Sequence, residues 1–199
     1  MYGLPTNTEI NKRLAKTQVF SVCDVSSAKQ EVFDADISRM VITHSLTTNT
    51  LTGISDSPDV KSIYVLKVLL KRREYNQKKI KTLFKLINQN MVLALHYEDR
   101  VQFVAFYEKL HFSAWINEQD ANLPLQGTNL SVVWENIVRF IGNLTADTSV
   151  SLSDQITEDS RKEELQKQID KLTIQMRKEK QPHRKAELHK QIVNLKKEL

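Results

Sequence analysis

Apolar residues change their spacing several times along the chain, and each spacing predicts a different element. Residues 61–70 contain nearly continuous hydrocarbon of strand length, which is typical of a central strand covered on both faces. Residues 91–97 and 101–107 are two more apolar runs with the turn-forming residues 98–100 between them, so they predict a hairpin. A further strand over residues 112–116 is expected to extend this hairpin.

The first forty residues show spacings that favour helices. Two apolar residues four positions apart follow Thr8, a residue that can cap a helix, and they predict a short helix over residues 8–16. A second helix is predicted from residue 26 or 27 to about residue 40. The threonine-rich and β-branched segment that follows, residues 41–48, favours an extended strand.

Apolar residues that repeat every three or four positions predict two more helices. The stripe of the first consists of Ile80, Leu83, Phe84 and Ile87, and its lysines point elsewhere. The second covers residues 129–144, carries a wider apolar stripe and is strongly amphipathic.

From residue 154 onward the chain loses its aromatic residues and carries only two thin apolar stripes among its charges. The stripes are Leu165, Ile169, Leu172 and Met176, and then Leu188, Ile192, Leu195 and Leu199. Each has the spacing of a heptad seam, but Pro182 lies between them and disfavours one continuous helix. Two arrangements remain open, a self-contained antiparallel helical hairpin and a coiled coil that binds a partner.

These elements together predict an α+β fold. Residues 1–145 form a globular domain with a small, mostly antiparallel sheet of four or five strands flanked by helices. Residues 146–153 have the composition of a linker, and residues 154–199 form a charged helical tail. The predicted core contains Ile63, Val65, Leu83, Phe84, Leu93, Leu95, Phe103, Trp115, Trp134 and Ile137.

The composition of the chain excludes several classes of protein and several kinds of site. The chain has 199 residues, of which 40% are apolar, and this is enough hydrocarbon for a globular core. Its single cysteine excludes an internal disulfide, its five histidines lack metal-ligand spacing, and its four glycines form no phosphate-binding loop. No apolar run is long enough to span a bilayer and no leader pattern opens the chain. We therefore expect a cytoplasmic protein that needs neither a cofactor nor a metal.

The net charge of +5 is concentrated in one segment. Residues 61–85 contain nine basic residues and one acid, whereas the rest of the chain is nearly balanced. Such a segment can attract the phosphates of a nucleic acid, although lysines on a helix commonly do no more than solvate its face. The residues predicted to contact nucleic acid are Lys67, Lys71, Arg72, Arg73, Lys78, Lys79, Lys81 and Lys85.

One enzyme class is suggested by residues near the same segment. Restriction-type nucleases hold Mg²⁺ with an aspartate and an acid-x-lysine pair, and Asp59 followed by Lys67 has that outline. Val65 stands where the second carboxylate belongs, so a metal site would need carboxylates that converge only in three dimensions. The candidates for such a site are Asp56, Asp59, Glu98 and Asp99.

A series of short strings follows a fixed order along the chain. They are residues 11–17, the strand pair ending near Trp115, residues 125–130 leading into Trp134 and Glu135, and residues 179–188. In this order they resemble the bacterial family known as domain of unknown function 4391. The resemblance implies a gene neighbourhood of DNA methyltransferases and helicases in restriction-type and phage-defence loci, and it brings no catalytic residues. The chain departs from the family pattern at Pro182, where an aromatic residue is more usual, and in residues 46–49.

The expected function is that of a non-catalytic accessory subunit of a DNA restriction-modification or phage-defence complex. In this hypothesis the basic segment contacts DNA, and the tail docks a methyltransferase or helicase of the same locus. The residues predicted to bind this partner are Leu165, Ile169, Leu172, Met176, Leu188, Ile192 and Leu195. Two alternatives stay open, a metal-dependent nuclease and a structural homo-oligomer formed through the tail.

Overall fold

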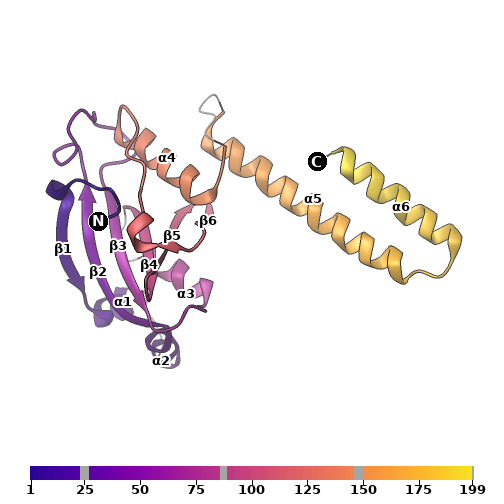
Figure 1. Cartoon of the computed structure of the whole chain (residues 1–199), viewed down its shortest axis with the longest axis horizontal. Coiled ribbons are helices and arrows are strands. Elements are labelled where there is room, and N and C mark those ends of the chain that lie inside the picture. The colour runs from indigo at the N-terminus through magenta and orange to yellow at the C-terminus, as the bar shows by residue number, and fades with distance from the viewer. Residues whose placement is uncertain (23–26, 86–88, 146–149, 199) are drawn as a thin grey trace. The chain divides into compact units, whose positions relative to one another are not determined.

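A computed structural model describes residues 1–22, 27–85, 89–145 and 150–198. The chain divides into two compact units, Met1–Ala146 and Asp147–Leu199, and each is described by itself. The first unit is built on a seven-stranded sheet, and the second is a pair of helices (Figure 1). This architecture confirms the predicted α+β class with a C-terminal helical tail.

The sheet has the strand order β1-β2-β3-β4-β5-β6, and β7 also pairs with β5. The strands are β1 Glu9–Leu14, β2 Ile37–Leu46, β3 Ile63–Leu70, β4 Asn90–Tyr97, β5 Arg100–Tyr107, β6 Lys109–Phe112 and β7 Ile116–Asn117. All neighbouring strands are antiparallel except β3 and β4, which are parallel and are connected through α3. The number of strands exceeds the predicted four or five because β1 adds an edge and the last predicted strand divides into β6 and β7.

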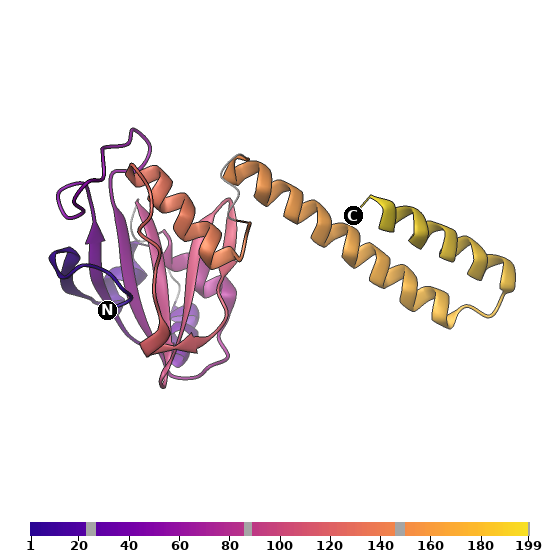
Figure 2. The same ribbon diagram turned by 45° about the horizontal axis from the view of Figure 1, so that its top comes forward.

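The helices of the first unit cover both faces of the sheet. They are α1 Lys16–Val22, α2 Ser27–Asp36, α3 Gln77–Leu83 and α4 Leu130–Gly142, with 3-10 turns at Thr6–Thr8 and Glu118–Asp120. Helices α1 to α3 lie on one face, and α4 packs against β5 and β6 on the other (Figures 1 and 2). Strand β3, between β2 and β4, is buried or half-buried along its whole length, as predicted for a central strand.

Most of the predicted core lies in these layers. Eight of the ten predicted core residues are buried, whereas Phe84 and Trp115 are partly buried against the core beneath α1 to α3. The predicted hairpin is confirmed as β4 and β5, with Tyr97 opposite Arg100 at its turn. Helix α4 is confirmed as well, and Asn129 caps it by accepting a hydrogen bond from a backbone N–H of its first turn.

The predicted helix over residues 8–16 is wrong, because Glu9–Leu14 form the edge strand β1. Thr8 caps no helix there, and its hydroxyl instead donates a hydrogen bond to the Pro5 carbonyl oxygen at 2.6 Å. Two apolar residues four positions apart stabilise a short helix less than the backbone hydrogen bonds that β1 forms with β2. The exposed charges of β1 are also typical of an edge strand that does not recruit another sheet.

The second predicted helix extends too far, since α2 ends at Asp36 and β2 begins at Ile37. A bulge at the start of β2 places Ile37 opposite Leu70 and Met40 opposite Val68, so both side chains reach the same core. Two apolar residues three positions apart on a bulged strand have the spacing of a helical turn. The sequence pattern therefore predicts a helix where a strand forms.

The second unit is an antiparallel helical hairpin of α5 Leu152–Lys178 and α6 Pro182–Lys197, visible at the end of the chain in Figure 1. Pro182 is the first residue of α6, a position whose backbone N–H has no partner within a helix. Of the two arrangements left open by the sequence, the self-contained hairpin is the one observed. Residues 146–149 of the predicted linker lie outside the described residues. No helix in the described part of the chain is long and apolar enough to cross a membrane.

Candidate nucleic-acid interface

Six of the predicted cationic residues lie between the end of β3 and residue 85, two positions after the end of α3. They are Lys71, Arg72, Arg73, Lys78, Lys81 and Lys85, and all six are exposed. We call this set the cationic ridge. The side chain of Lys79 lies outside the described part, and Lys67 lies elsewhere in the fold.

Helix α3 turns an apolar side toward the sheet and a basic side toward solvent. Asn76 caps the helix by accepting the backbone N–H of Lys78 at 2.9 Å. Ile80 is buried in the core, whereas Lys78 and Lys81, one turn apart, share the exposed side. Lys85 follows the end of the helix and is exposed too. Packing of α3 against the sheet thus brings these lysines to one surface.

A buried carboxylate holds the connection between β3 and α3. Asp36, the last residue of α2, is 1% exposed and accepts a hydrogen bond from Arg72 Nε at 2.7 Å. The backbone N–H of Lys71 donates to the Asp36 carbonyl oxygen at 2.8 Å. The side chain of Arg72 nevertheless remains 60% exposed. Its guanidinium is therefore held in place and still faces solvent.

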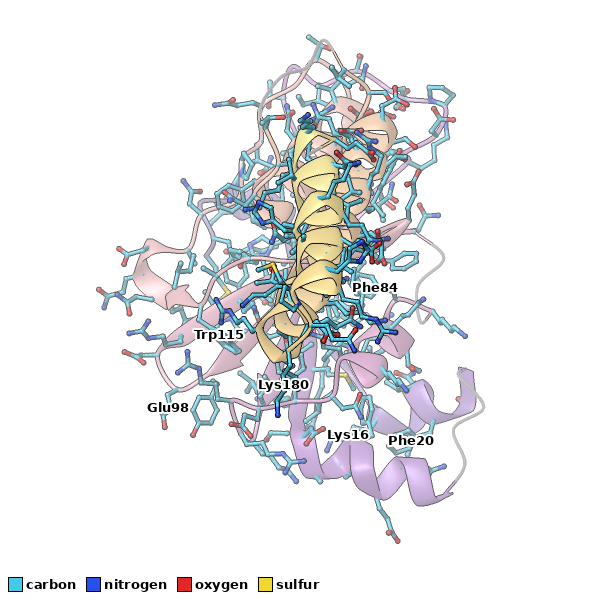
Figure 3. The ribbon with its side chains drawn as sticks, turned by 90° about the vertical axis from the view of Figure 1, so that its right-hand side faces the viewer. Lys16, Phe20, Phe84, Glu98, Trp115 and Lys180 are labelled. Atoms are coloured by element: carbon cyan, nitrogen blue, oxygen red, sulfur yellow. The ribbon has the colours of Figure 1, made fainter. Side chains whose placement is uncertain are left out.

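Two aromatic rings hold further cations of the ridge. Arg73 Cζ lies 5.9 Å from the centre of the Trp115 ring, and Lys81 Nζ lies 5.5 Å from the centre of the Phe106 ring. Each such contact contributes roughly 0.5–1 kcal/mol at an exposed site. Trp115 is labelled in Figure 3. The rings restrict the two cations without neutralising their charge.

Lys67 points away from the ridge. Its neighbours Leu66 and Val68 are buried beneath α1 to α3, so the alternation of side chains along β3 turns Lys67 to the opposite face. On that face Lys67 Nζ donates a hydrogen bond to Glu118 Oε1 at 3.0 Å. Lys67 therefore lies on the other face of the sheet, paired with Glu118, and does not extend the ridge.

The Lys67 ion pair belongs to a polar cluster that sequence reasoning missed. The cluster consists of Tyr2, Lys67, His96 and Glu118, and we call it the His96 cluster. His96 Nε2 lies 2.6 Å from the Tyr2 hydroxyl oxygen, and His96 Nδ1 lies 3.6 Å from Glu118 Oε1. Both Tyr2 and His96 are 3% exposed. The one available signal was an ionisable residue, His96, within an otherwise apolar strand.

Burial sets the protonation states in the His96 cluster. Burial and the nearby Lys67 ammonium lower the pKa of His96 to about 4, so its imidazole is neutral at pH 7. The neutral ring accepts the Tyr2 hydroxyl hydrogen at Nε2 and directs its Nδ1–H toward Glu118. The hydrogen bond from Lys67 lowers the pKa of Glu118, and burial raises the pKa of Tyr2. The cluster thus joins the N-terminal segment to the sheet through one chain of polar contacts.

The carboxylates of the nuclease hypothesis are spread over separate parts of the first unit. Asp56 accepts a hydrogen bond from the Thr48 hydroxyl at 3.0 Å, and Asp59 is exposed near it in sequence. Glu98 and Asp99 form the turn between β4 and β5. Asp99 lines a hollow of about 420 Å³ together with Glu118. Across the described residues, no three His, Cys, Asp or Glu side chains converge to hold a metal ion.

The predicted partner-binding residues line the inside of the hairpin. Leu165, Ile169 and Ile192 are buried, and Leu172, Met176, Leu188 and Leu195 are half-buried. The two stripes therefore cover one another within one chain. Ile174 and Val193 remain 54% and 38% exposed, so the hairpin leaves apolar surface outside this seam.

A family model described as "Domain of unknown function (DUF4391)" matches residues 2–199. The match covers both compact units. No curated protein and no solved structure matches the chain.

Proposed function

The chain belongs to the DUF4391 family, and on this premise we propose that it is a non-catalytic accessory subunit that contacts DNA through the cationic ridge. One observation carries the proposal. Six exposed cations follow one another within residues 71–85, and the acids that offset them are Glu74 within this segment and Asp36, which is paired with Arg72. Cations gathered over so short a distance can contact several phosphates of one duplex.

The way the ridge is held supports this proposal. Arg72 is fixed by Asp36, and Arg73 and Lys81 lie over aromatic rings, so these charges lose less conformational freedom on binding than free side chains would. Phosphate contacts carry no sequence information, and we expect the ridge to bind duplexes of different sequence alike.

We infer further that the subunit works in the cytoplasm within a DNA restriction-modification or phage-defence complex. The gene neighbourhood implied by the family resemblance supports this setting, with a methyltransferase or helicase as the protein partner. The helical hairpin is our candidate for the docking element, because Ile174 and Val193 keep apolar surface exposed on it.

A salt titration of duplex binding tests the role of the ridge. Fluorescence anisotropy measures the affinity of the wild-type chain and of K78Q/K81Q/K85Q at increasing salt concentration. Each lost phosphate contact should reduce the slope of log affinity against log salt by about 0.9, so we expect a decrease of roughly 2 to 3. The control variant K162Q/K167Q/K171Q removes the same charge from exposed positions on α5.

The control variant should retain the wild-type slope. Equal affinity and equal slope for the ridge variant and the wild type at low salt would contradict DNA binding by the ridge. Degradation of the duplex by the purified chain in magnesium would contradict the non-catalytic part of the proposal and would favour the nuclease alternative.

A further inference from the structure

A hollow of about 290 Å³ lies where β1 ends and β2 begins. Arg13, Lys16, Thr17, Ser38 and Arg39 contribute to its lining together with three apolar residues, and no carboxylate among the described residues does. Basic and hydroxyl side chains that line one hollow without an acid provide hydrogen-bond donors and positive charge for an anion.

Arg13 and Arg39 come from neighbouring strands and share one face of the sheet. Arg13 lies opposite Val41 in the ladder between β1 and β2, and Arg39 lies two residues before Val41 on β2. Residues two positions apart on a strand point to the same face. Diagonal neighbours of this kind are roughly 7–8 Å apart, a separation that lets two long side chains contact one ligand between them.

The charges of these two arginines are not neutralised by a neighbour. Both side chains are exposed, and neither forms an ion pair within the described part of the chain. Lys16 differs, because its Nζ lies 2.6 Å from both Asp34 Oδ1 and the Ile37 carbonyl oxygen. Lys16 is therefore a fixed wall of the hollow, while the two guanidinium groups remain available to a ligand.

We propose that this hollow binds a phosphomonoester. Two guanidinium groups present planar pairs of N–H donors, the geometry that matches phosphate oxygens in bidentate contacts. A phosphomonoester carries a charge of about −1.5 to −2 at pH 7 and ends in three free oxygens. A phosphodiester inside a polymer has one charge and a substituent on each side, so it fits a concave site less well.

The position of the hollow connects it with the ridge. Ile37 lies opposite Leu70, the residue before Lys71, so β2 begins beside the end of β3 where the ridge starts. Arg72 is bound to Asp36, two residues before Ser38 of the hollow.

Arg13 and Arg39 share the face that carries Lys67, because Val41 lies opposite both Arg13 and Lys67. The hollow therefore lies at the end of the sheet where the ridge starts, but its two arginines face away from α3. We infer that the ligand is the 5′-phosphate of a DNA end that reaches the hollow past this end of the sheet. This assignment rests on the proposed function, whereas the binding of a phosphomonoester does not.

Two probes test the inference on the full chain. The first is a duplex of one sequence with either 5′-phosphate or 5′-hydroxyl ends, and its affinity is measured by anisotropy at fixed salt. We expect the phosphate to strengthen wild-type binding about tenfold, the effect of one charge-assisted contact. The second probe is inorganic phosphate, detected by the broadening of its phosphorus NMR signal. R13Q/R39Q should lose both effects, and R177Q/R184Q, with the same charge change on the hairpin, should retain them.

The outcomes separate this inference from the proposed function. If R13Q/R39Q abolishes the binding of inorganic phosphate, the site is supported even when the 5′-phosphate of the duplex does not change its affinity. The ligand is then a free phosphate compound. If the ridge variant loses duplex binding but still binds inorganic phosphate, the phosphate site in the hollow does not depend on the ridge. Wild-type protein that responds to neither probe, or R13Q/R39Q protein that responds as the wild type does, overturns it. The variant R13K/R39K, which keeps the charge, controls for folding and should bind phosphate more weakly than the wild type.

Discussion

His96 shows how a single buried residue links the stability of the first unit to pH. An unfolded histidine titrates near pH 6.5, whereas the pKa of His96 in the folded chain is lowered to about 4. Between these two pH values the unfolded chain binds the proton and the folded chain does not. The contribution of the neutral His96 to the free energy of unfolding is therefore fully present above about pH 6.5 and is lost as the pH falls toward 4.

We predict that the free energy of unfolding falls by up to roughly 3 kcal/mol through His96 between about pH 6.5 and pH 4. Urea unfolding at a series of pH values measures this slope, and the substitution H96Q should make it shallower. It should not become flat, because burial also lowers the pKa of His44. The control H183Q changes an exposed histidine of α6 and should keep the wild-type slope. Identical slopes for H96Q and the wild type would rule out this account.

The His96 cluster also marks a limit of sequence reasoning. Lys67 was predicted to contact nucleic acid because basic residues surround it in the sequence. Its direction depends on the alternation along β3, and its partner Glu118 lies 51 positions away. The number of basic residues between residues 61 and 85 identifies the ridge, but only the fold shows that Lys67 is not part of it.

At the scale of elements, the spacing of apolar residues was enough to predict an element wherever one spacing continued over its whole length. Strand β3, the hairpin of β4 and β5, and helix α4 were predicted for this reason. Prediction failed where tertiary contacts compete with the local pattern. Glu9–Leu14 become a strand by pairing with β2, and a bulge gives Ile37 and Met40 a helical spacing on a strand.

The stability of the α5–α6 hairpin depends on few side chains, because its apolar seam is covered only by these two helices. Ile169 is 4% exposed at that seam, so I169A should cost roughly 2–5 kcal/mol of local stability. Hydrogen exchange should then accelerate in α5 and α6 and stay unchanged in β3 and β4. The control I174A removes a similar side chain that is 54% exposed and should leave exchange in the hairpin near the wild-type rate. Faster exchange throughout the sheet in I169A would show that the two units unfold together.

At the scale of the whole molecule, the closed seam changes the expectation for assembly. The sequence left the tail open as a dimerisation device, because each apolar stripe needs a second one to cover it. In the hairpin the two stripes cover each other, and Leu165 and Ile192 are buried without a second chain. Among the described residues of α5 and α6, the large apolar side chains that stay exposed are Ile174 and Val193, and their surface is small compared with what a stable dimer buries.

We therefore predict that the full chain has the mass of one copy in light scattering at micromolar concentration, and that I174Q/V193Q leaves this mass unchanged. If the proposed function holds, the two exposed side chains contact a different protein, and the same double substitution should weaken its binding without changing the thermal unfolding temperature. A mass of two copies that returns to one in I174Q/V193Q would instead identify these residues as the contact between copies. That result would favour the homo-oligomer over the accessory subunit, because the surface available for a different partner would already be occupied.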